Sequence, residues 1–318
     1  MDETEPEAAP WWSPRRRVLA IVAVAAVVVA TVAIVERVDR GPPDPPPGSW
    51  TMVVHRGLGA WVDDYDWTVE LGGAEPLVDE DDIEAMAAAG VQTVYVQTSH
   101  NRSASDVMEP ERLDGLLDAA HAHGMHVVAW YLPTLTDVDD DLRRLEAAAE
   151  LRVDGLAVDI ETTAVEDVAE RNRRLLDLSE RLRAAVPAER PIGAITLSAV
   201  HIQVVNPAFW PEYPWAELAA TYDVIMPMAY WSIRRGELQE GGRYVGENIE
   251  RIRASTGDPD IPIHVVGGIA DGVTDADLTA MVAAIEDGGA IGGSLYDWVT
   301  SEPEHWSTLG TLMALRAG

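Results

Sequence analysis

The segment at residues 154–161, with the sequence Asp-Gly-Leu-Ala-Val-Asp-Ile-Glu, ends in two carboxylic acids two residues apart. Its apolar residues predict a buried β-strand, and side chains alternate between the two faces of a strand. Asp159 and Glu161 therefore point the same way, about 7 Å apart along the strand. Two acids on a buried strand cost free energy unless they reach solvent, a ligand or a partner. The pattern predicts carboxylate chemistry at the mouth of a barrel.

Two carboxyl groups that flank a scissile bond are the usual equipment for hydrolysing a glycosidic bond. One of them must be protonated near neutral pH to act as an acid, and burial beside another carboxylate raises its pKa. Asp159 and Glu161 fit this requirement, with Asp159 either sharing a proton with Glu161 or orienting a substrate group. A buried ion pair with an arginine, or a bound water network, is the structural alternative for both acids.

From about residue 50 onward, short apolar runs alternate with amphipathic stretches. The candidate strands are 57–62, 91–98, 125–132, 154–161, 192–199, 223–231, 261–268 and 290–298. The candidate helices are 80–89, 110–123, 138–151, 165–186, 214–221, 244–256, 275–287 and a last one near 303–315. Such alternation implies a parallel sheet, and eight units of this length predict a closed (β/α)8 or TIM barrel. A doubly wound open sheet is the alternative, but no G-x-G-x-x-G opens a helix here.

Active sites of such barrels lie at the C-terminal ends of the strands, and in this chain those ends are rich in acids and aromatic residues. The residues are Asp63, Asp64, Tyr65, Asp66, Trp67, Gln97, Ser99, His100, Trp130, Tyr131, Asp159, Glu161, Ser198, His201, Tyr230, Trp231, Asp271, Tyr296, Asp297 and Trp298. Aromatic rings stack on sugar faces while carboxylates bind hydroxyl groups, so the mouth is typical of a carbohydrate cleft. Among these aromatics, Trp130 fits a core position best, and Met226 and Met228 are interpreted as barrel core.

Three segments resemble family 18 glycoside hydrolases, the chitinase type. Residues 154–161 are similar to the D-G-x-D-x-D-x-E signature of the family's fourth strand. Residues 226–230, Met-Pro-Met-Ala-Tyr, resemble its M-x-Y-D motif on strand 6. Residues 292–298, Gly-Gly-Ser-Leu-Tyr-Asp-Trp, resemble its strand 8, where a tryptophan floors the sugar site. Each segment falls on the strand number that the barrel prediction assigns to it.

This resemblance implies that Glu161 is the general acid that protonates the glycosidic oxygen. Asp159 would orient the N-acetyl group of the substrate, whose carbonyl oxygen acts as the internal nucleophile. Tyr230 would hydrogen-bond the acetamido group, and Trp298 would stack beneath the sugar. Further substrate contacts are predicted for Trp231, Tyr296, Asp297, Gln97, Tyr131, Asp63 and Trp67. No metal ion or organic cofactor is implied.

Two residues depart from the family pattern. The first Asp of D-x-D-x-E is Ala157, which removes a charge beside Asp159, and the Asp after M-x-Y is Trp231. Residues 159–161 also resemble the D-x-E pair of family 25 lysozyme-like muramidases. The predicted function is hydrolysis of an N-acetylhexosamine-containing polysaccharide or cell-wall glycan. The alternative is a non-catalytic glycan-binding barrel that retains the aromatic cleft.

Composition excludes several other classes of function. The chain of 318 residues has 54 acids against 23 bases, a formal net charge of −31, and every base is an arginine. Such a surface repels nucleic acid and anionic lipid headgroups, so no nucleic-acid partner is expected. The absence of cysteine excludes disulfides and thiol catalysis.

Residues 18–35 form an uncharged apolar run of 18 residues. As a helix the run would be about 27 Å long, which just reaches the length of a membrane span. Three arginines at 15–17 precede it and predict a cytoplasmic N-terminus. We therefore expect a cytoplasmic acidic tail at 1–17, a single-pass anchor in the cell membrane, a proline-rich linker at 36–49 and an extracytoplasmic barrel at 50–318. A cleaved signal peptide is the alternative, although no clear small-x-small site follows the run.

Two further signals are interpreted as structural. His55-Arg-Gly resembles the opening of glycerophosphodiester phosphodiesterases, but the metal-binding E-x-D pair of those enzymes does not follow it. His121, His123 and His126 have the spacing of a metal cluster. They flank the start of the third strand, however, and so belong to the N-terminal face of the barrel.

Overall fold

The structure is a computed structural model that describes residues 50–270 and 272–317. The predicted tail, anchor and linker, and the strand-end residue Asp271, lie outside the described residues. Within the described part of the chain, no helix is both long and apolar enough to span a membrane.

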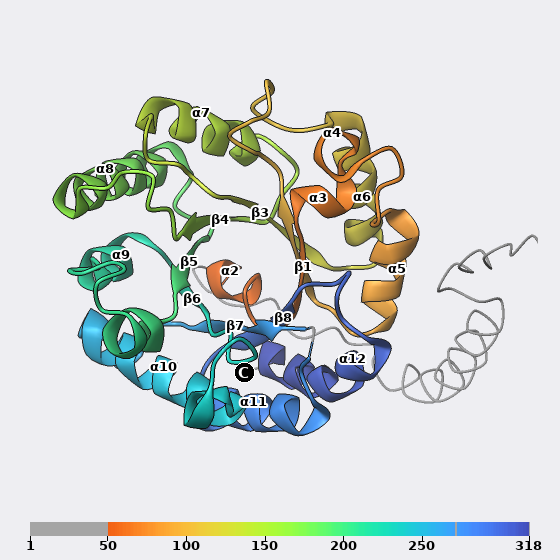
Figure 1. The fold of residues 1–318 in the computed structure, drawn as a ribbon. Helices are drawn as coiled ribbons and strands as arrows, with labels where there is room; N and C mark the ends of the chain where they lie inside the picture. Colours follow the sequence, from red (N-terminus) through yellow and green to blue (C-terminus); the bar gives the residue numbers. More distant parts are fainter. Residues whose placement is uncertain (1–49, 271, 318) are drawn as a thin grey trace, which may run out of the picture. The chain divides into compact units, whose positions relative to one another are not determined.

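Eight parallel strands close into a barrel in chain order, with β1 paired to both β2 and β8 (Figure 1). The strands are β1 (Gly57–Val62), β2 (Thr93–Gln97), β3 (His126–Tyr131), β4 (Gly155–Ile160), β5 (Ile192–Leu197), β6 (Val224–Met228), β7 (His264–Ile269) and β8 (Gly292–Tyr296). This confirms the predicted (β/α)8 barrel. Every predicted strand overlaps the observed one, and the differences are a few residues at the ends.

Helices surround the barrel in the same order (Figure 1). The main ones are α5 (Glu80–Ala88), α6 (Pro110–Ala122), α7 (Val138–Ala149), α8 (Val168–Ala185), α9 (Trp215–Thr221), α10 (Gly241–Thr256), α11 (Asp275–Asp287) and α12 (Pro303–Leu309). Short helices that the apolar pattern does not predict are α2 (Trp50–Val53), α3 (Asp64–Trp67), α4 (Val69–Gly72), a π-helical turn η1 (His201–Val205) and the 3-10 helix η2 (Gly236–Gln239). The predicted last helix near 303–315 is divided into α12 and the 3-10 helix η3 (Gly310–Ala317).

Some of the many aspartates cap the N-termini of helices. The side chains of Asp79, Asp137 and Asp167 accept hydrogen bonds from backbone N–H groups in the first turns of α5, α7 and α8. These N–H groups have no partner within the helix, and a negative charge there also interacts favourably with the helix dipole.

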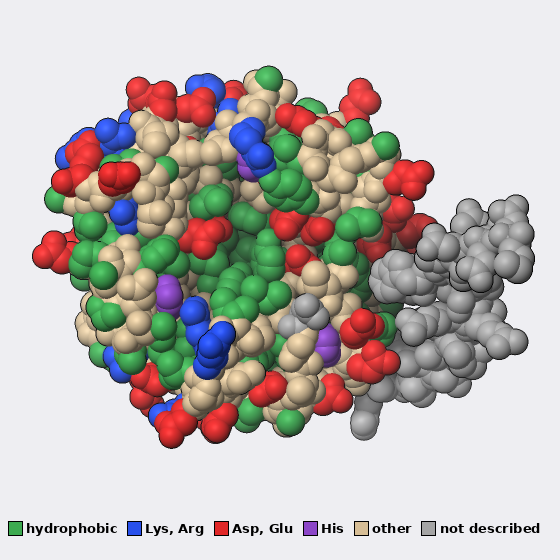
Figure 2. Space-filling view, in the orientation of Figure 1, with side chains coloured by type: hydrophobic (Ala, Val, Ile, Leu, Met, Phe, Trp, Pro, Cys, Tyr) green, Lys and Arg blue, Asp and Glu red, His purple; other side chains and the backbone are tan. Residues whose placement is uncertain are grey.

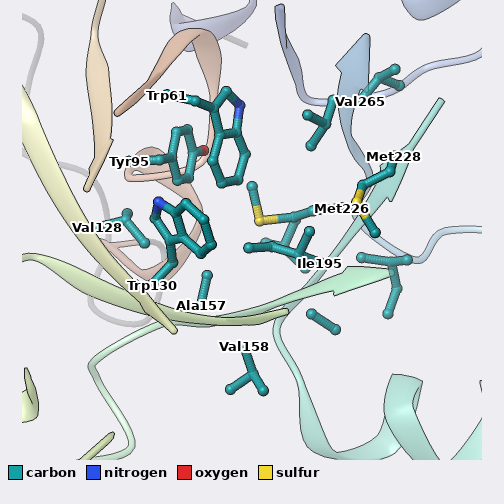
Figure 3. Packing of buried hydrophobic residues seen from close by; sticks show 14 of the residues in the cluster. Trp61, Tyr95, Val128, Trp130, Ala157, Val158, Ile195, Met226, Met228 and Val265 are labelled. Atoms are coloured by element: carbon teal, nitrogen blue, oxygen red, sulfur yellow. The ribbon is translucent and has the colours of Figure 1, made fainter. Parts of the chain in front are cut away.

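Aromatic residues fill the interior of the barrel up to its mouth (Figure 3). The Trp61 ring stacks on Tyr95 with centroids 4.3 Å apart and meets Trp130 edge to face at 5.9 Å. Room for the Tyr95 ring comes from Gly59, where a Cβ atom would lie 2.6 Å from that ring. Because this packing closes the interior, ligands reach the barrel only from the mouth.

A series of buried hydrogen bonds lies below these rings. The Trp61 indole donates a hydrogen bond to Ser294 Oγ at 2.7 Å, and Ser294 Oγ lies 3.0 Å from His264 Nε2. His264 Nδ1 donates to the backbone oxygen of His55 at 2.8 Å. His55 is itself buried and hydrogen-bonded to the Tyr95 hydroxyl. The His-Arg-Gly motif is therefore part of the barrel floor.

Burial lowers the pKa of His264 to about 4, and burial followed by the neighbouring His264 lowers that of His55 to about 3. A histidine with a depressed folded-state pKa stabilises the fold above its unfolded pKa near 6.5. That contribution is lost as the pH falls towards the folded value.

We predict that His264→Gln reduces the loss of unfolding free energy that occurs as the pH falls. Between pH 7 and pH 5 the wild type should lose about 2 kcal/mol of unfolding free energy relative to the variant, because residue 264 of the wild type binds a proton in the unfolded chain but not in the folded protein. Urea unfolding at both pH values measures the difference. Equal pH dependence in the two proteins would show that His264 titrates normally in the folded state.

Candidate active site

A cavity of about 170 Å³ opens at the C-terminal mouth of the barrel. Its lining combines two acids with aromatic and aliphatic side chains from seven of the strands and the residues that follow them. The lining residues are Trp61, Trp130, Asp159, Glu161, Ile195, Met228, Tyr230, Val266 and Tyr296. In Figure 2 the central hollow is lined mainly by hydrophobic side chains, with acidic groups at its edge.

The two acids of the fourth strand meet in this cavity. Asp159 is only 7% exposed, and its Oδ1 atom has no hydrogen-bond partner within residues 50–270 and 272–317. Burial, and then the charge of Glu161, raise the pKa of Asp159 well above its ordinary value. Burial also raises the pKa of the half-buried Glu161. Neither acid forms an ion pair with any arginine in the described part of the chain, so no guanidinium group offsets the rise that burial causes in their pKa values.

Two tyrosines face the acids. The rings of Tyr230 and Tyr296 lie 6.0 Å apart. Burial, and then the carboxyl groups of Asp159 and Glu161, raise the pKa of Tyr230 well above 10, so its hydroxyl stays a hydrogen-bond donor at any working pH. The Tyr296 hydroxyl donates to Asp63 Oδ2 at 3.0 Å, which fixes the ring at the cavity wall.

Trp130 occupies the space beside the missing acid of the fourth strand. It pairs in register with Ala157, and Figure 3 shows its indole over the alanine methyl group. The Trp130 Nε1 atom is buried and has no partner among the described residues. Trp130 and Met228, which the sequence places in the core, thus also line the cavity. Trp61 was missed as a lining residue, although strand alternation points it inward from β1.

Trp231 and Trp298 do not line the cavity. Trp231 is 1% exposed, and its ring lies between two glycines: Cβ atoms at Gly241 and Gly268 would approach it at 3.0 and 3.2 Å. Trp298 packs on Trp306 with centroids 4.9 Å apart. Tyr296, two residues earlier, occupies the cavity wall on this strand.

Three other predicted contact residues hold the loops around the mouth. Trp67 is fully buried and donates to the backbone oxygen of Gln97 at 2.9 Å. Gln97 bonds the backbone of Asp64 and Ser99. Tyr131 points to the outer side of its strand and donates to Asp141 Oδ1 at 2.7 Å. These residues support the site without reaching it.

Asp63, Asp66 and Asp297 gather next to Tyr296, with carboxylate oxygens within 4.8 Å of one another. In the described part of the chain this is the one group of acids and histidines with the spacing of metal ligands. Burial, and then the charges of Asp63 and Asp297, raise the pKa of Asp66 to about 8. A proton on Asp66 therefore relieves the repulsion at neutral pH, and no second feature of the cluster points to a cation.

The histidine cluster lies elsewhere. His121 Nε2 is 3.0 Å from Asp154 Oδ2, and His126 Nδ1 is 3.7 Å from the other oxygen of Asp154. Asp154 directly precedes β4, so this contact is at the N-terminal face, as expected.

No protein-family model matches the chain, and no curated protein matches it in sequence. Its fold is similar to that of several solved structures. The spore cortex-lytic enzyme SleL of Bacillus cereus aligns with a TM-score of 0.59 and 11% identity over 80% of this chain and 73% of SleL. The PgaB (BpsB) glycoside hydrolase domain of Bordetella bronchiseptica aligns with a TM-score of 0.58 and 13% identity over 81% of this chain and 99% of that domain.

A chitinase from Chromobacterium violaceum aligns with a TM-score of 0.56 and 10% identity, over 81% of this chain and 99% of the chitinase. At these identities the comparison establishes the fold. The barrel of this chain is similar in fold to those of these glycoside hydrolases.

The acid cluster leads to a stability prediction. A carboxyl group whose folded-state pKa is raised stabilises the fold only below its unfolded pKa, and this contribution is lost as the pH rises through the folded value. Asp66→Asn keeps the oxygen that accepts the Asp63 N–H but carries no charge. We expect the variant to be more stable than the wild type by about 1–3 kcal/mol at pH 8.5 and equally stable near pH 4. Thermal unfolding across this range measures the gap, and a gap that does not depend on pH would contradict the raised pKa.

Proposed function

We propose that this protein is a glycoside hydrolase that cleaves a glycan containing N-acetylhexosamine, with Glu161 as the proton donor. The observation that carries the proposal is the burial of Asp159 and Glu161 side by side in the barrel-mouth cavity, where both acids have raised pKa values. A general acid must hold its proton near neutral pH, and burial beside a second carboxyl group provides this.

In the proposed reaction Glu161 gives its proton to the glycosidic oxygen as the bond from that oxygen to C1 breaks. The carbonyl oxygen of the substrate's own acetamido group attacks C1 and forms a cyclic intermediate, as in substrate-assisted glycosidases. Asp159 orients the acetamido group and accepts its N–H, while the Tyr230 hydroxyl donates to the same group. Water then adds to C1 and returns a proton to Glu161.

The aromatic lining suits this reaction. Trp61, Trp130 and Tyr296 surround the acids on the apolar side of the cavity. Apolar rings exclude water from the acids and offer faces to a sugar ring. The unpartnered Trp130 N–H and Asp159 Oδ1 are a donor and an acceptor that a bound sugar can satisfy.

Ala157 favours the alternative function, a glycan-binding barrel without turnover. The acid that the family carries at this position would share a proton with Asp159 in the barrel, and Trp130 fills that space here. We further propose that residues 18–35 anchor the protein in the cell membrane with the barrel outside, where a cell-wall glycan would be its substrate.

Glu161→Gln should lower kcat roughly a thousandfold on N-acetylglucosamine oligomers or peptidoglycan, because it removes the proton donor. Glu166→Gln is the matched control, since Glu166 is an exposed acid in the loop that follows the same strand. Reducing-end release by the full-length proteins measures both rates. Oligomer binding without turnover in the wild type, unchanged by Glu161→Gln, would instead establish the binding module.

The wild-type pH–rate profile should be bell-shaped. Its alkaline limb should lie above the ordinary range of a glutamic acid, because activity needs protonated Glu161 and burial raises the pKa of that group. The limbs report apparent values of the Asp159 and Glu161 pair, not of one residue. A rate that keeps rising from pH 5 to pH 9 would exclude a carboxylic acid as the proton donor.

A further inference from the structure

The arginine side chains in the described part of the chain fall into three groups. Most of the described arginines form ion pairs with Asp or Glu on the outer helices. Four more donate to backbone carbonyl oxygens, namely Arg56, Arg171, Arg190 and Arg253. Arg102, Arg234 and Arg235 have neither kind of partner among the described residues. In a chain with 54 acids and 23 bases, an arginine without an ion pair is unexpected.

All three of these arginines lie in loops at the mouth of the barrel. Arg102 follows β2, and Arg234 and Arg235 follow β6. Because the eight strands close in order, β2 and β6 are four strands apart and lie on opposite sides of the mouth. Figure 2 shows arginine and histidine side chains on two opposite sides of the central hollow.

The loop that carries Arg102 is held in place from below. Arg144, only 5% exposed, donates to the backbone oxygens of His100, Ser103 and Ser105. His100 Nδ1 accepts the backbone N–H of Arg102 at 3.0 Å, and the Arg102 guanidinium donates to the Tyr65 hydroxyl. One buried arginine thus fixes a loop that presents a second, exposed arginine. Arg102 forms no ion pair among the described residues, although its charge acts on the carboxyl group of Asp64 and lowers the pKa of that group.

A different network holds Arg234 on the opposite side. Its Nε atom donates to the Tyr244 hydroxyl at 3.1 Å, and this hydroxyl lies 2.7 Å from Ser198 Oγ. Ser198 Oγ also accepts the backbone N–H of His201 at 3.1 Å. The remaining guanidinium nitrogens of Arg234 have no described protein acceptor, and Arg235 beside it is exposed.

The acids lie on the perpendicular line across the mouth. Asp159 and Glu161 belong to β4, while Asp63 and Asp297 follow β1 and β8 on the far side. A sugar chain that runs from the β2 side to the β6 side therefore places its central linkage at the acids. Its two ends then lie against the arginines.

We propose that the substrate glycan carries a carboxylate group on a sugar at each side of the cleaved bond, and that Arg102 binds one of these carboxylates while Arg234 and Arg235 bind the other. This inference rests on the proposed function and specifies its substrate class. A guanidinium pairs with a carboxylate through two parallel hydrogen bonds, which fixes position as well as charge. The net charge of −31 repels anions elsewhere on the surface, so carboxylates are accepted only where these arginines meet them.

The test compares two tetrasaccharides. One alternates N-acetylglucosamine with N-acetylmuramic acid, and the other is the same molecule with its carboxyl groups reduced to alcohols. Binding is measured by calorimetry on full-length Glu161→Gln, which removes turnover. We expect the carboxylated form to bind about tenfold more tightly at low salt, since each exposed ion pair adds a modest, salt-dependent gain in affinity. Adding Arg102→Gln, Arg234→Gln and Arg235→Gln together should abolish this preference.

Arg152→Gln is the matched charge control, because Arg152 pairs with Asp114 and Asp118 just before β4, away from the mouth. The double variant Arg102→Gln/Arg235→Gln keeps Arg234 and so leaves its hydrogen bond to Tyr244 intact. We expect it to reduce the carboxylate preference at least by half. This variant controls for misfolding of the triple variant. Equal binding of the two oligomers, or a preference that survives in the triple variant, overturns the inference. Equally tight binding of a sulfated N-acetylglucosamine oligomer overturns the assignment to carboxylates.

Hydrolysis by the wild type is scored separately. A carboxylate preference without turnover would uphold the substrate class and contradict the proposed hydrolase. Turnover of both oligomers at equal kcat/KM would uphold the proposed hydrolase and contradict the inferred substrate class.

Discussion

The packing of Trp61 against Tyr95 and Trp130 determines where chemistry is possible in this protein. These rings fill the barrel interior to the level of the mouth, so the remaining cavity is small and bordered by carbon on most sides. Asp159 and Glu161 must then share a site with little water. Their ionised forms are disfavoured for that reason, and the same aromatic packing that stabilises the fold also raises the pKa values of the two acids.

Acidic and basic side chains lie on different sides of the barrel mouth. Acids lie on the β4 side and on the side of β1 and β8, and arginines without acidic partners lie on the β2 and β6 sides. Buried networks hold each group in place, with Arg144 beneath one loop and Tyr244 beside the other. An anionic glycan is attracted only along the line between the β2 and β6 sides, where these arginines lie. The arginines would therefore orient the glycan across the barrel before it contacts Asp159 and Glu161.

The barrel was predictable because apolar runs and amphipathic stretches alternate regularly, and strand alternation alone pairs Asp159 with Glu161 on one face. The placement of the aromatics was harder to predict. Trp231 follows Tyr230 in sequence, yet it packs outward between Gly241 and Gly268. Those glycines are far away in the chain, and nothing in the local pattern reveals the slot that they create. Trp298 likewise turns towards Trp306, a contact that depends on how the last helix docks.

The buried acids have a thermodynamic consequence for the whole chain. Burial and neighbouring acids raise the pKa of Asp64 to about 7 and that of Asp66 to about 8, and Asp159 and Glu161 are shifted in the same direction. The folded protein at neutral pH therefore holds protons that the unfolded chain would release, and its true charge is less negative than the formal −31. Folding takes up these protons from the buffer. The heat of unfolding should accordingly vary with the ionisation enthalpy of the buffer. The slope of this dependence gives the number of protons that the protein releases on unfolding.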